Sequence, residues 1–317
     1  MALSKNSPVV NLDSDFWQGF YKKIWQKKSI VIKNVATPLL QLDADYVFSL
    51  LVDYSNKCRK LKTVDGLKFY VQGQRQYDED VLQILPIKND KSFTGYHARM
   101  NKLFSDYCLV CDEILQVTVS KKYLLTNFTG ELYKHIGFPN RFSEMGLYIG
   151  NYKKTPFGVH VDPCDVFSFP VVGTKKFRIW RPEYIKKNKS LIESHFYEKH
   201  KKNSDLLSAQ PGDMAYWPSS AWHIAESDGA FSATWSLGVW VDKTHAEVIS
   251  EVFNEIIKKE LKKIGQTKTV QLNKNINELP ELYKKSAELL SQLTKKRLEA
   301  EFLKSWKILI SKKGLKI

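Results

Sequence analysis

The sequence GVHVDP at residues 158–163 places His160 and Asp162 two positions apart. In an extended strand, side chains two positions apart leave the same face, so these two can hold one ion between them. A second histidine, His223, follows much later in the sequence AWHI. Two imidazoles and one carboxylate form the facial triad that binds non-haem Fe(II) and leaves coordination positions open. We therefore predict a metal site at these three residues, although a His-X-Asp pair alone is also common in surface hydrogen bonds.

The residues after this pair alternate as β-strands do. VFSFPVV at residues 166–172 predicts a buried strand, Gly173 predicts a turn, and KKFRIW at residues 175–180 predicts a second strand. Lys175 shares a face with the apolar Phe177 and Ile179, and a buried lysine needs an anionic partner or loses its charge. The distal carboxylate of 2-oxoglutarate, the usual co-substrate of such an iron site, would be that partner. The alternative is a solvated turn, which is the ordinary place for paired lysines.

The residues around His223 continue the strand pattern. QPGDMAYWP at residues 210–218 predicts a turn followed by a short strand, and residues 230–241 predict a further strand. Strands and turns therefore repeat from about residue 145 to residue 241. This repetition predicts a small antiparallel barrel or sandwich whose interior can hold a ligand.

Three motifs in this order carry a family resemblance: HVDPCDVF from His160, GTKKFRIW from Gly173, and QPGDMAYWP followed by the Trp-His pair ending at His223. Together they resemble the JmjC/cupin-type 2-oxoglutarate oxygenases, in particular the ribosomal-oxygenase-like and factor-inhibiting-HIF-like hydroxylases. The likeness covers residues 146–241. It implies an α+β chain with a mainly β core, a double-stranded β-helix of the jelly-roll type, that uses Fe(II), 2-oxoglutarate and O2.

The same resemblance implies roles for individual residues. His160, Asp162 and His223 would be the catalytic iron ligands, and Lys175 would pair with the distal carboxylate of 2-oxoglutarate. Val166 stands where many JmjC members carry asparagine, so the rest of the 2-oxoglutarate pocket is less defined. The further candidates for hydroxyl contacts to 2-oxoglutarate are Tyr148, Thr234 and Ser236.

By resemblance, the protein is a hydroxylase of an amino-acid side chain in a peptide or protein. The alternatives are hydroxylation of a small molecule or biosynthetic intermediate, demethylation of N-methyl-lysine, and a non-catalytic cupin that acts as a binding module. The triad does not distinguish protein hydroxylation, small-molecule hydroxylation and demethylation, because each would use the same iron centre. The non-catalytic cupin is disfavoured because such a relative has no chemical need for all three metal ligands.

Outside the barrel we predict three regions. Residues 1–145 form an N-terminal helical and mixed region that packs on the barrel, residues 146–243 form the barrel itself, and residues 244–317 form C-terminal helices. A polar, lysine-rich insertion at residues 181–208 contains His195 and His200, which we predict to be solvated. The other expected elements are helices at 13–26, 42–58, 98–118, 245–264 and within 279–309, and strands at 29–34 and 68–71.

The remaining predictions concern partners and location. The chain has a formal net charge of +15, which fits nucleic acid or a ribosomal particle, but lysines that are spread along loops and helices are also ordinary solvated surface. No long apolar segment or secretory signal occurs, which predicts a cytoplasmic protein away from membranes. The resemblance implies a homodimer through the C-terminal helices and makes Tyr70 and Tyr96 candidate substrate contacts. The closely spaced Cys108 and Cys111 are predicted to lie buried in a helix.

Overall fold

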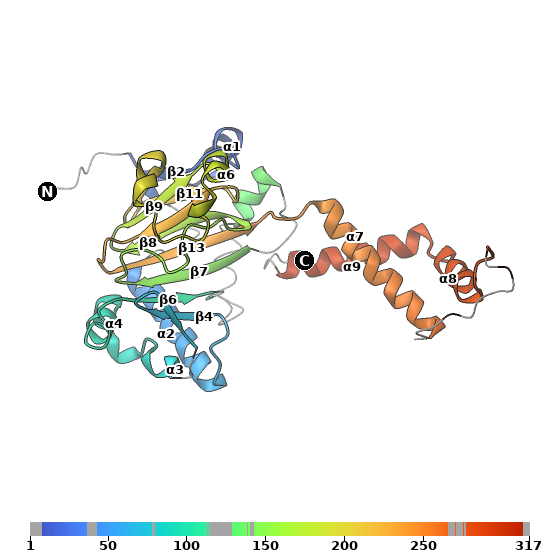
Figure 1. Cartoon of the computed structure of the whole chain (residues 1–317), viewed down its shortest axis with the longest axis horizontal. Coiled ribbons are helices and arrows are strands. Elements are labelled where there is room, and N and C mark those ends of the chain that lie inside the picture. Colours follow the sequence, from blue (N-terminus) through green and yellow to red (C-terminus); the bar gives the residue numbers. More distant parts are fainter. Residues whose placement is uncertain are drawn as a thin grey trace. The chain divides into compact units, whose positions relative to one another are not determined.

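The structure is a computed structural model that describes residues 8–36, 43–77, 80–112, 114, 129–137, 139, 143–265, 270, 275 and 277–312. The chain forms two compact units, Met1–Asp242 and Lys243–Ile317, and each is described by itself. Among the described residues, the first unit contains three β-sheets with helices (Figure 1). The division of the chain into three regions stays a prediction.

The first part of this unit alternates short strands with helices. It contains β1 (Val10–Asn11), α1 (Ser14–Lys23), β2 (Ile30–Ile32), β3 (Val35–Ala36), α2 (Ala44–Leu61), β4 (Leu67–Val71), β5 (Gln74–Gln76), α3 (Val81–Ile84), the 3-10 helix η1 (Lys88–Asp90), α4 (Phe93–Met100) and β6 (Tyr107–Cys111). The helices expected at 13–26 and 42–58 are confirmed as α1 and α2, and the two expected strands as β2 and β4. Asp13 caps α1 by accepting a hydrogen bond from the backbone N–H of Phe16.

The helix predicted at residues 98–118 is wrong. Its start belongs to α4, which ends at Met100, and Tyr107–Cys111 then form strand β6 between β4 and β7. Cys108 and Cys111 are both buried, as expected, but in a strand whose opposite faces they occupy. Cross-strand pairing on both sides overrode the local pattern, which a sequence window does not see. Part of the predicted helix lies outside the described residues.

The barrel consists of two facing sheets. Its strands are β7 (Ser143–Gly150), β8 (Cys164–Val172), β9 (Lys175–Trp180), β10 (Asp205–Ala209), β11 (Met214–Trp217), β12 (Trp222–Glu226) and β13 (Ser232–Trp240). An eight-stranded sheet has the order β2-β11-β8-β13-β7-β6-β4-β5, and a three-stranded sheet has the order β10-β9-β12. Within the barrel all pairings are antiparallel. This is the predicted double-stranded β-helix, extended at both edges of the large sheet by N-terminal strands.

Strand β13 alternates small or polar residues with larger apolar ones, and its two faces have different surroundings. Ala233, Trp235, Leu237 and Val239 on one face belong to the main hydrophobic core, which also contains side chains from α1 and α2. On the opposite face, Thr234, Ser236, Gly238 and Trp240 line a cavity between the two larger sheets. The alternation along β13 therefore separates a face that packs in the core from a face that lines the cavity.

Phe167 on β8 lies at the centre of the main core. Its ring contacts the rings of Trp17, Phe20, Trp25 and Tyr216. We expect Phe167→Ala to lower the free energy of unfolding by about 3–5 kcal/mol, because a buried phenylalanine leaves a cavity when it is truncated. Urea unfolding of the full-length protein measures this change. The matched control is Phe196→Ala, since that side chain is 86% exposed and its loss should change the free energy by less than about 0.5 kcal/mol.

Between β9 and β10 the chain forms the predicted insertion. It contains α6 (Pro182–Lys187) and the 3-10 helices η3 (Lys189–Leu191) and η4 (Glu198–Asn203). The insertion was predicted to extend to residue 208, but Asp205–Ala209 form β10 and pair with β9. The insertion segment therefore comprises residues 181–204, and that name is used for it below.

The second unit is helical. It contains α7 (His245–Leu261), the 3-10 helix η5 (Lys262–Ile264), α8 (Glu281–Ser291) and α9 (Lys295–Lys312), which confirms the predicted C-terminal helices. Thr244 and Glu247 form a capping box at the start of α7. Glu260 is buried and pairs with Arg297 of α9 and Lys263 of η5, which holds these elements together. Among the described residues, no helix combines the length and apolar character needed to cross a membrane.

Candidate functional site

The three predicted metal ligands lie together at one wall of the cavity. The Nε2 atom of His160 is 3.6 Å from Oδ1 of Asp162, and the Nε2 atom of His223 is 3.4 Å from Oδ2 of the same carboxylate. One ligand atom from each residue falls within 4.8 Å of the others. In the described part of the chain, this is the one cluster of histidine, cysteine and acidic side chains close enough to share an ion.

Local backbone structure brings the two histidines side by side. His223 lies on β12, whereas His160 lies in an extended segment before β8 and not in a regular strand as expected. The two residues form an isolated antiparallel bridge in which His160 N–H donates to the carbonyl of His223 (3.0 Å) and His223 N–H donates back (2.7 Å). This pair of bonds sets the separation of two ligands that are far apart in the sequence.

The backbone also fixes which nitrogen of each ring faces the carboxylate. Nδ1 of His160 lies 3.0 Å from the carbonyl oxygen of Gly158, and Nδ1 of His223 lies 3.1 Å from that of Ala221. A carbonyl oxygen only accepts hydrogen bonds, so each Nδ1 carries a proton, and in the neutral ring the lone pair is then on Nε2. This is the tautomer that a metal requires, with the outer nitrogen held by a backbone acceptor.

The charges at the site also suit a cation. Burial, and then the proximity of His223, lower the pKa of His160, which keeps its imidazole neutral at neutral pH. Burial acts to raise the pKa of Asp162, but the hydrogen bond and charge of His223 and the charge of His160 outweigh it, so this pKa lies below its ordinary value. The site thus presents a neutral imidazole at His160 and an ionised carboxylate at Asp162, with the second imidazole of His223 beside them.

Lys175 on β9 is 1% exposed, so the solvated-turn interpretation is wrong. Its ammonium group donates hydrogen bonds to the hydroxyls of Tyr152 and Ser227 (2.9 Å for Ser227), and neither partner carries a negative charge. Ser227 is hydrogen-bonded in turn to Ser232. Burial lowers the pKa of Lys175 to about 7. An ammonium group in this position is well prepared to bind an anion.

A cavity of about 690 Å³ lies between the sheets and contains both the triad and Lys175 in its wall. Tyr148, Thr234 and Ser236, the three predicted hydroxyl contacts, also line this cavity. The hydroxyl of Ser236 is hydrogen-bonded to that of Ser168 (3.0 Å). The buried hydroxyl of Thr234 and the buried indole N–H of Trp217 find no hydrogen-bond partner within the described protein, and both line the cavity. Buried polar atoms of this kind are satisfied by a bound ligand.

Several residues in or next to the cavity had no recognisable signal in the sequence. Tyr152 and Ser227 support Lys175, but neither stands in a motif. His195 of the insertion segment also lines the cavity, with Nε2 3.0 Å from the carbonyl of Pro156, and His200 is hydrogen-bonded to the hydroxyl of Tyr184 (2.8 Å). Both histidines, expected to be solvated, are half-buried and hydrogen-bonded, and neither joins the triad. Tyr70 and Tyr96 do not line the cavity, and Tyr96 is fully buried in the main core.

Comparison with known proteins identifies a family that matches the part of the chain containing this site. Residues 134–247 match the family described as "JmjC domain". Among solved structures, a ribosomal oxygenase from Escherichia coli, YcfD, in complex with cobalt and 2-oxoglutarate is 15% identical, with a TM-score of 0.49 over 90% of this chain and 69% of that chain. The same protein in complex with cobalt and succinic acid is 16% identical at the same TM-score and coverage. Curated proteins gave no match.

The family match covers the barrel, the triad, Lys175 and the insertion segment. It agrees with the double-stranded β-helix that the strand order shows. Residues 134–247 therefore match a JmjC domain, with a cupin-type barrel at its core.

Proposed function

We propose that this protein is an Fe(II)- and 2-oxoglutarate-dependent hydroxylase of an amino-acid side chain in a peptide or protein. The observation that carries the proposal is one cavity whose wall holds both a His-Asp-His triad and a buried lysine without a carboxylate partner. His160, Asp162 and His223 would hold the metal ion, and Lys175 would hold the distal carboxylate of 2-oxoglutarate. The unpaired hydroxyl of Thr234 and the hydroxyls of Tyr148 and Ser236 are the further contacts we assign to 2-oxoglutarate.

The residues of the chain prepare the site in three ways. The carbonyls of Gly158 and Ala221 hold the imidazole rings with Nε2 toward the ion. Asp162 stays ionised at neutral pH and neutralises part of the positive charge of the ion. The apolar side chains of Val166 and Phe177 line the cavity and limit the access of water. When bound, Fe(II) would supply the oxidising chemistry. In the overall reaction, O2 and 2-oxoglutarate yield succinate and CO2, and one C–H bond of the substrate becomes C–OH.

The direct test is production of succinate from 2-oxoglutarate by the purified protein with Fe(II) and O2. We expect Fe(II)-dependent succinate formation that stops when a chelator removes the metal, and that increases when a substrate peptide is present. A protein that binds neither metal ion nor 2-oxoglutarate would contradict the proposal. If turnover increases with a small molecule and not with any peptide, the substrate class proposed here is wrong while the chemistry stands.

Two further predictions on partners and location accompany this function. Large apolar side chains on the C-terminal helices are exposed, among them Ile249, Phe253, Tyr283 and Leu303. Such side chains suit a covered surface, which supports the predicted homodimer through these helices. The positive net charge supports a nucleic acid or ribosomal particle as a partner, and the cytoplasmic location also stays a prediction.

A further inference from the structure

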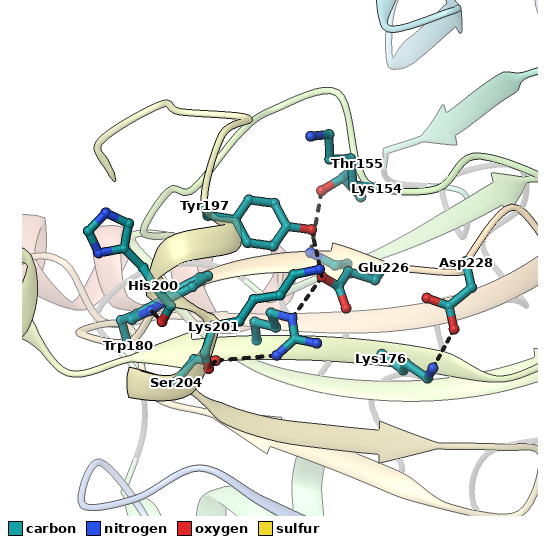
Figure 2. Close-up of polar contacts among 12 residues, drawn as sticks. Lys154, Thr155, Lys176, Trp180, Tyr197, His200, Lys201, Ser204, Glu226 and Asp228 are labelled. Atoms are coloured by element: carbon teal, nitrogen blue, oxygen red, sulfur yellow. Dashed lines mark hydrogen bonds and ion pairs between the residues drawn. The ribbon is translucent and has the colours of Figure 1, made fainter. Parts of the chain in front are cut away.

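Strand β12 carries a buried carboxylate on the face opposite to the metal site. His223 and Ala225 line the cavity, whereas Glu226 points to the other side of the small sheet, where it is 5% exposed. Its Oε1 atom accepts hydrogen bonds from Nε of Arg178 on β9 (2.8 Å) and from the hydroxyl of Tyr197 (2.6 Å). Figure 2 shows Tyr197 and Lys201 of the insertion segment directed at this carboxylate. A charge this deeply buried requires such partners.

Through Tyr197, the insertion segment is attached to the outer face of the small sheet. Tyr197 belongs to a small hydrophobic cluster whose other buried members are Val159, Trp180, Ile185, Leu191 and Ile224. The indole N–H of Trp180 donates to the carbonyl of His200 (3.1 Å), which ties the end of β9 to the same segment. The cluster therefore joins three parts of the chain, namely the sheet, the insertion segment and the residues just before His160.

The insertion segment is also hydrogen-bonded to the backbone next to His160. The N–H of Val159 donates to the carbonyl of Ser194 (3.0 Å), and the N–H of Glu193 donates to the carbonyl of Val159 (2.8 Å). Gly158 has a φ of +70°, and a Cβ atom there would lie 2.3 Å from the carbonyl oxygen of Glu193. Only glycine allows this close approach without displacing one of the two backbones.

Gly158 is also the residue that orients His160. Its carbonyl oxygen accepts the Nδ1–H of His160, and this bond directs Nε2 toward the carboxylate of Asp162. The Glu226–Tyr197 contact, the insertion segment, Gly158 and the imidazole of His160 thus form a continuous series of contacts. Burial raises the pKa of Tyr197, so its hydroxyl remains a neutral donor at every physiological pH.

We propose that Tyr197 and Glu226 are positioning residues for the metal centre and act through the insertion segment on Gly158. This inference rests on the proposed function, because it assumes that His160 binds a metal ion. It gives the insertion segment a fixed structural role at the active site, in contrast to a lid that opens and closes. Groups that orient a metal-binding histidine typically change metal affinity by 10–100-fold when they are lost.

The test compares two tyrosine-to-phenylalanine variants of the full-length protein. Tyr197→Phe removes the hydroxyl that reaches Glu226. Tyr184→Phe removes a hydroxyl of the same insertion segment whose partners, His200 (2.8 Å) and Asn203 (3.1 Å), lie within that segment. Co²⁺ serves as the probe, with its affinity and visible absorption spectrum measured for each variant, and thermal melting of the metal-free proteins is recorded alongside.

We expect Tyr197→Phe to bind Co²⁺ about tenfold more weakly than the wild type and with an altered visible spectrum. Tyr184→Phe should match the wild type in both. Equal affinity and identical spectra for the two variants would overturn the inference, even if Tyr197→Phe melted at a lower temperature. Failure of the wild type itself to bind Co²⁺ would instead contradict the proposed function.

A second variant serves if Tyr197→Phe does not fold. Lys154 donates from its ammonium group to the carbonyl of His195, and its Nζ atom lies 5.4 Å from the centre of the Tyr197 ring. Lys154→Met keeps the length of this half-buried side chain but removes both contacts, so it also loosens the insertion segment. Weaker Co²⁺ binding by this variant would support the inference, and unchanged binding would contradict it.

Discussion

Asp162→Ala is expected to reduce metal-dependent succinate formation below detection and to weaken Co²⁺ binding by at least about 100-fold. The variant removes the one anionic ligand of the triad, and two neutral imidazoles alone hold a divalent ion poorly. The two histidine rings keep their backbone acceptors at Gly158 and Ala221, so the fold of the site should survive. Titration with Co²⁺, followed by visible absorption, separates loss of metal from loss of turnover.

The control for this result is Asp205→Ala. Asp205 is an exposed aspartate at the start of β10 and does not line the cavity. Its loss should leave Co²⁺ affinity and succinate formation unchanged. Asp162→Ala protein that still binds Co²⁺ as tightly as the wild type would show that the triad is not the metal site.

Lys175→Met is expected to weaken 2-oxoglutarate binding roughly 100-fold while Co²⁺ affinity stays close to that of the wild type. The change removes the buried charge that we assign to the distal carboxylate, and loss of one member of such a pair costs about 2–5 kcal/mol. Isothermal titration with 2-oxoglutarate in the presence of Co²⁺ measures the effect. Unchanged affinity would mean that the carboxylate binds elsewhere in the cavity.

The pKa of about 7 for Lys175 gives this prediction a pH signature. Above pH 7 the lysine of the free protein is largely neutral, so binding of the carboxylate takes up a proton and the dissociation constant should rise by up to tenfold per pH unit. Lys175→Met should remove this dependence. The pKa is lower in the folded than in the unfolded protein, so the metal-free wild type should gain stability as pH rises from 7 to about 10.5.

The sequence was sufficient to predict the barrel and the pair of His160 and Asp162 because their signals are local, whereas His223 was added through the family resemblance. His160 and Asp162 stand two positions apart, and the strands from β7 to β13 alternate or form apolar runs between clear turns. Burial of Lys175 was one of two interpretations that its spacing from Phe177 allowed, and the resemblance favoured it. These features depend on spacing within a few residues, which a single sequence displays directly.

The features that the sequence did not reveal depend on contacts between distant segments. Tyr152 and Ser227 meet at Lys175 although they lie 75 positions apart, and no local pattern marks either residue. The strand β6 was predicted as a helix because its apolar residues fit both periods, and only its pairing with β4 and β7 selects the strand. His195 was assigned to solvent because its contact with Pro156 is equally non-local.

The pairing of β2 with β11 has a consequence for how the protein folds. Residues Ile30–Ile32 complete the edge of the large sheet only with Met214–Tyr216, and the aromatic rings of the preceding helix α1 pack against Phe167 and Tyr216. During synthesis, the apolar face of α1 is therefore covered only after Phe167 and Tyr216, which lie far along the chain, have been made. Contacts between such distant residues slow folding, because the chain between them must be ordered before they form.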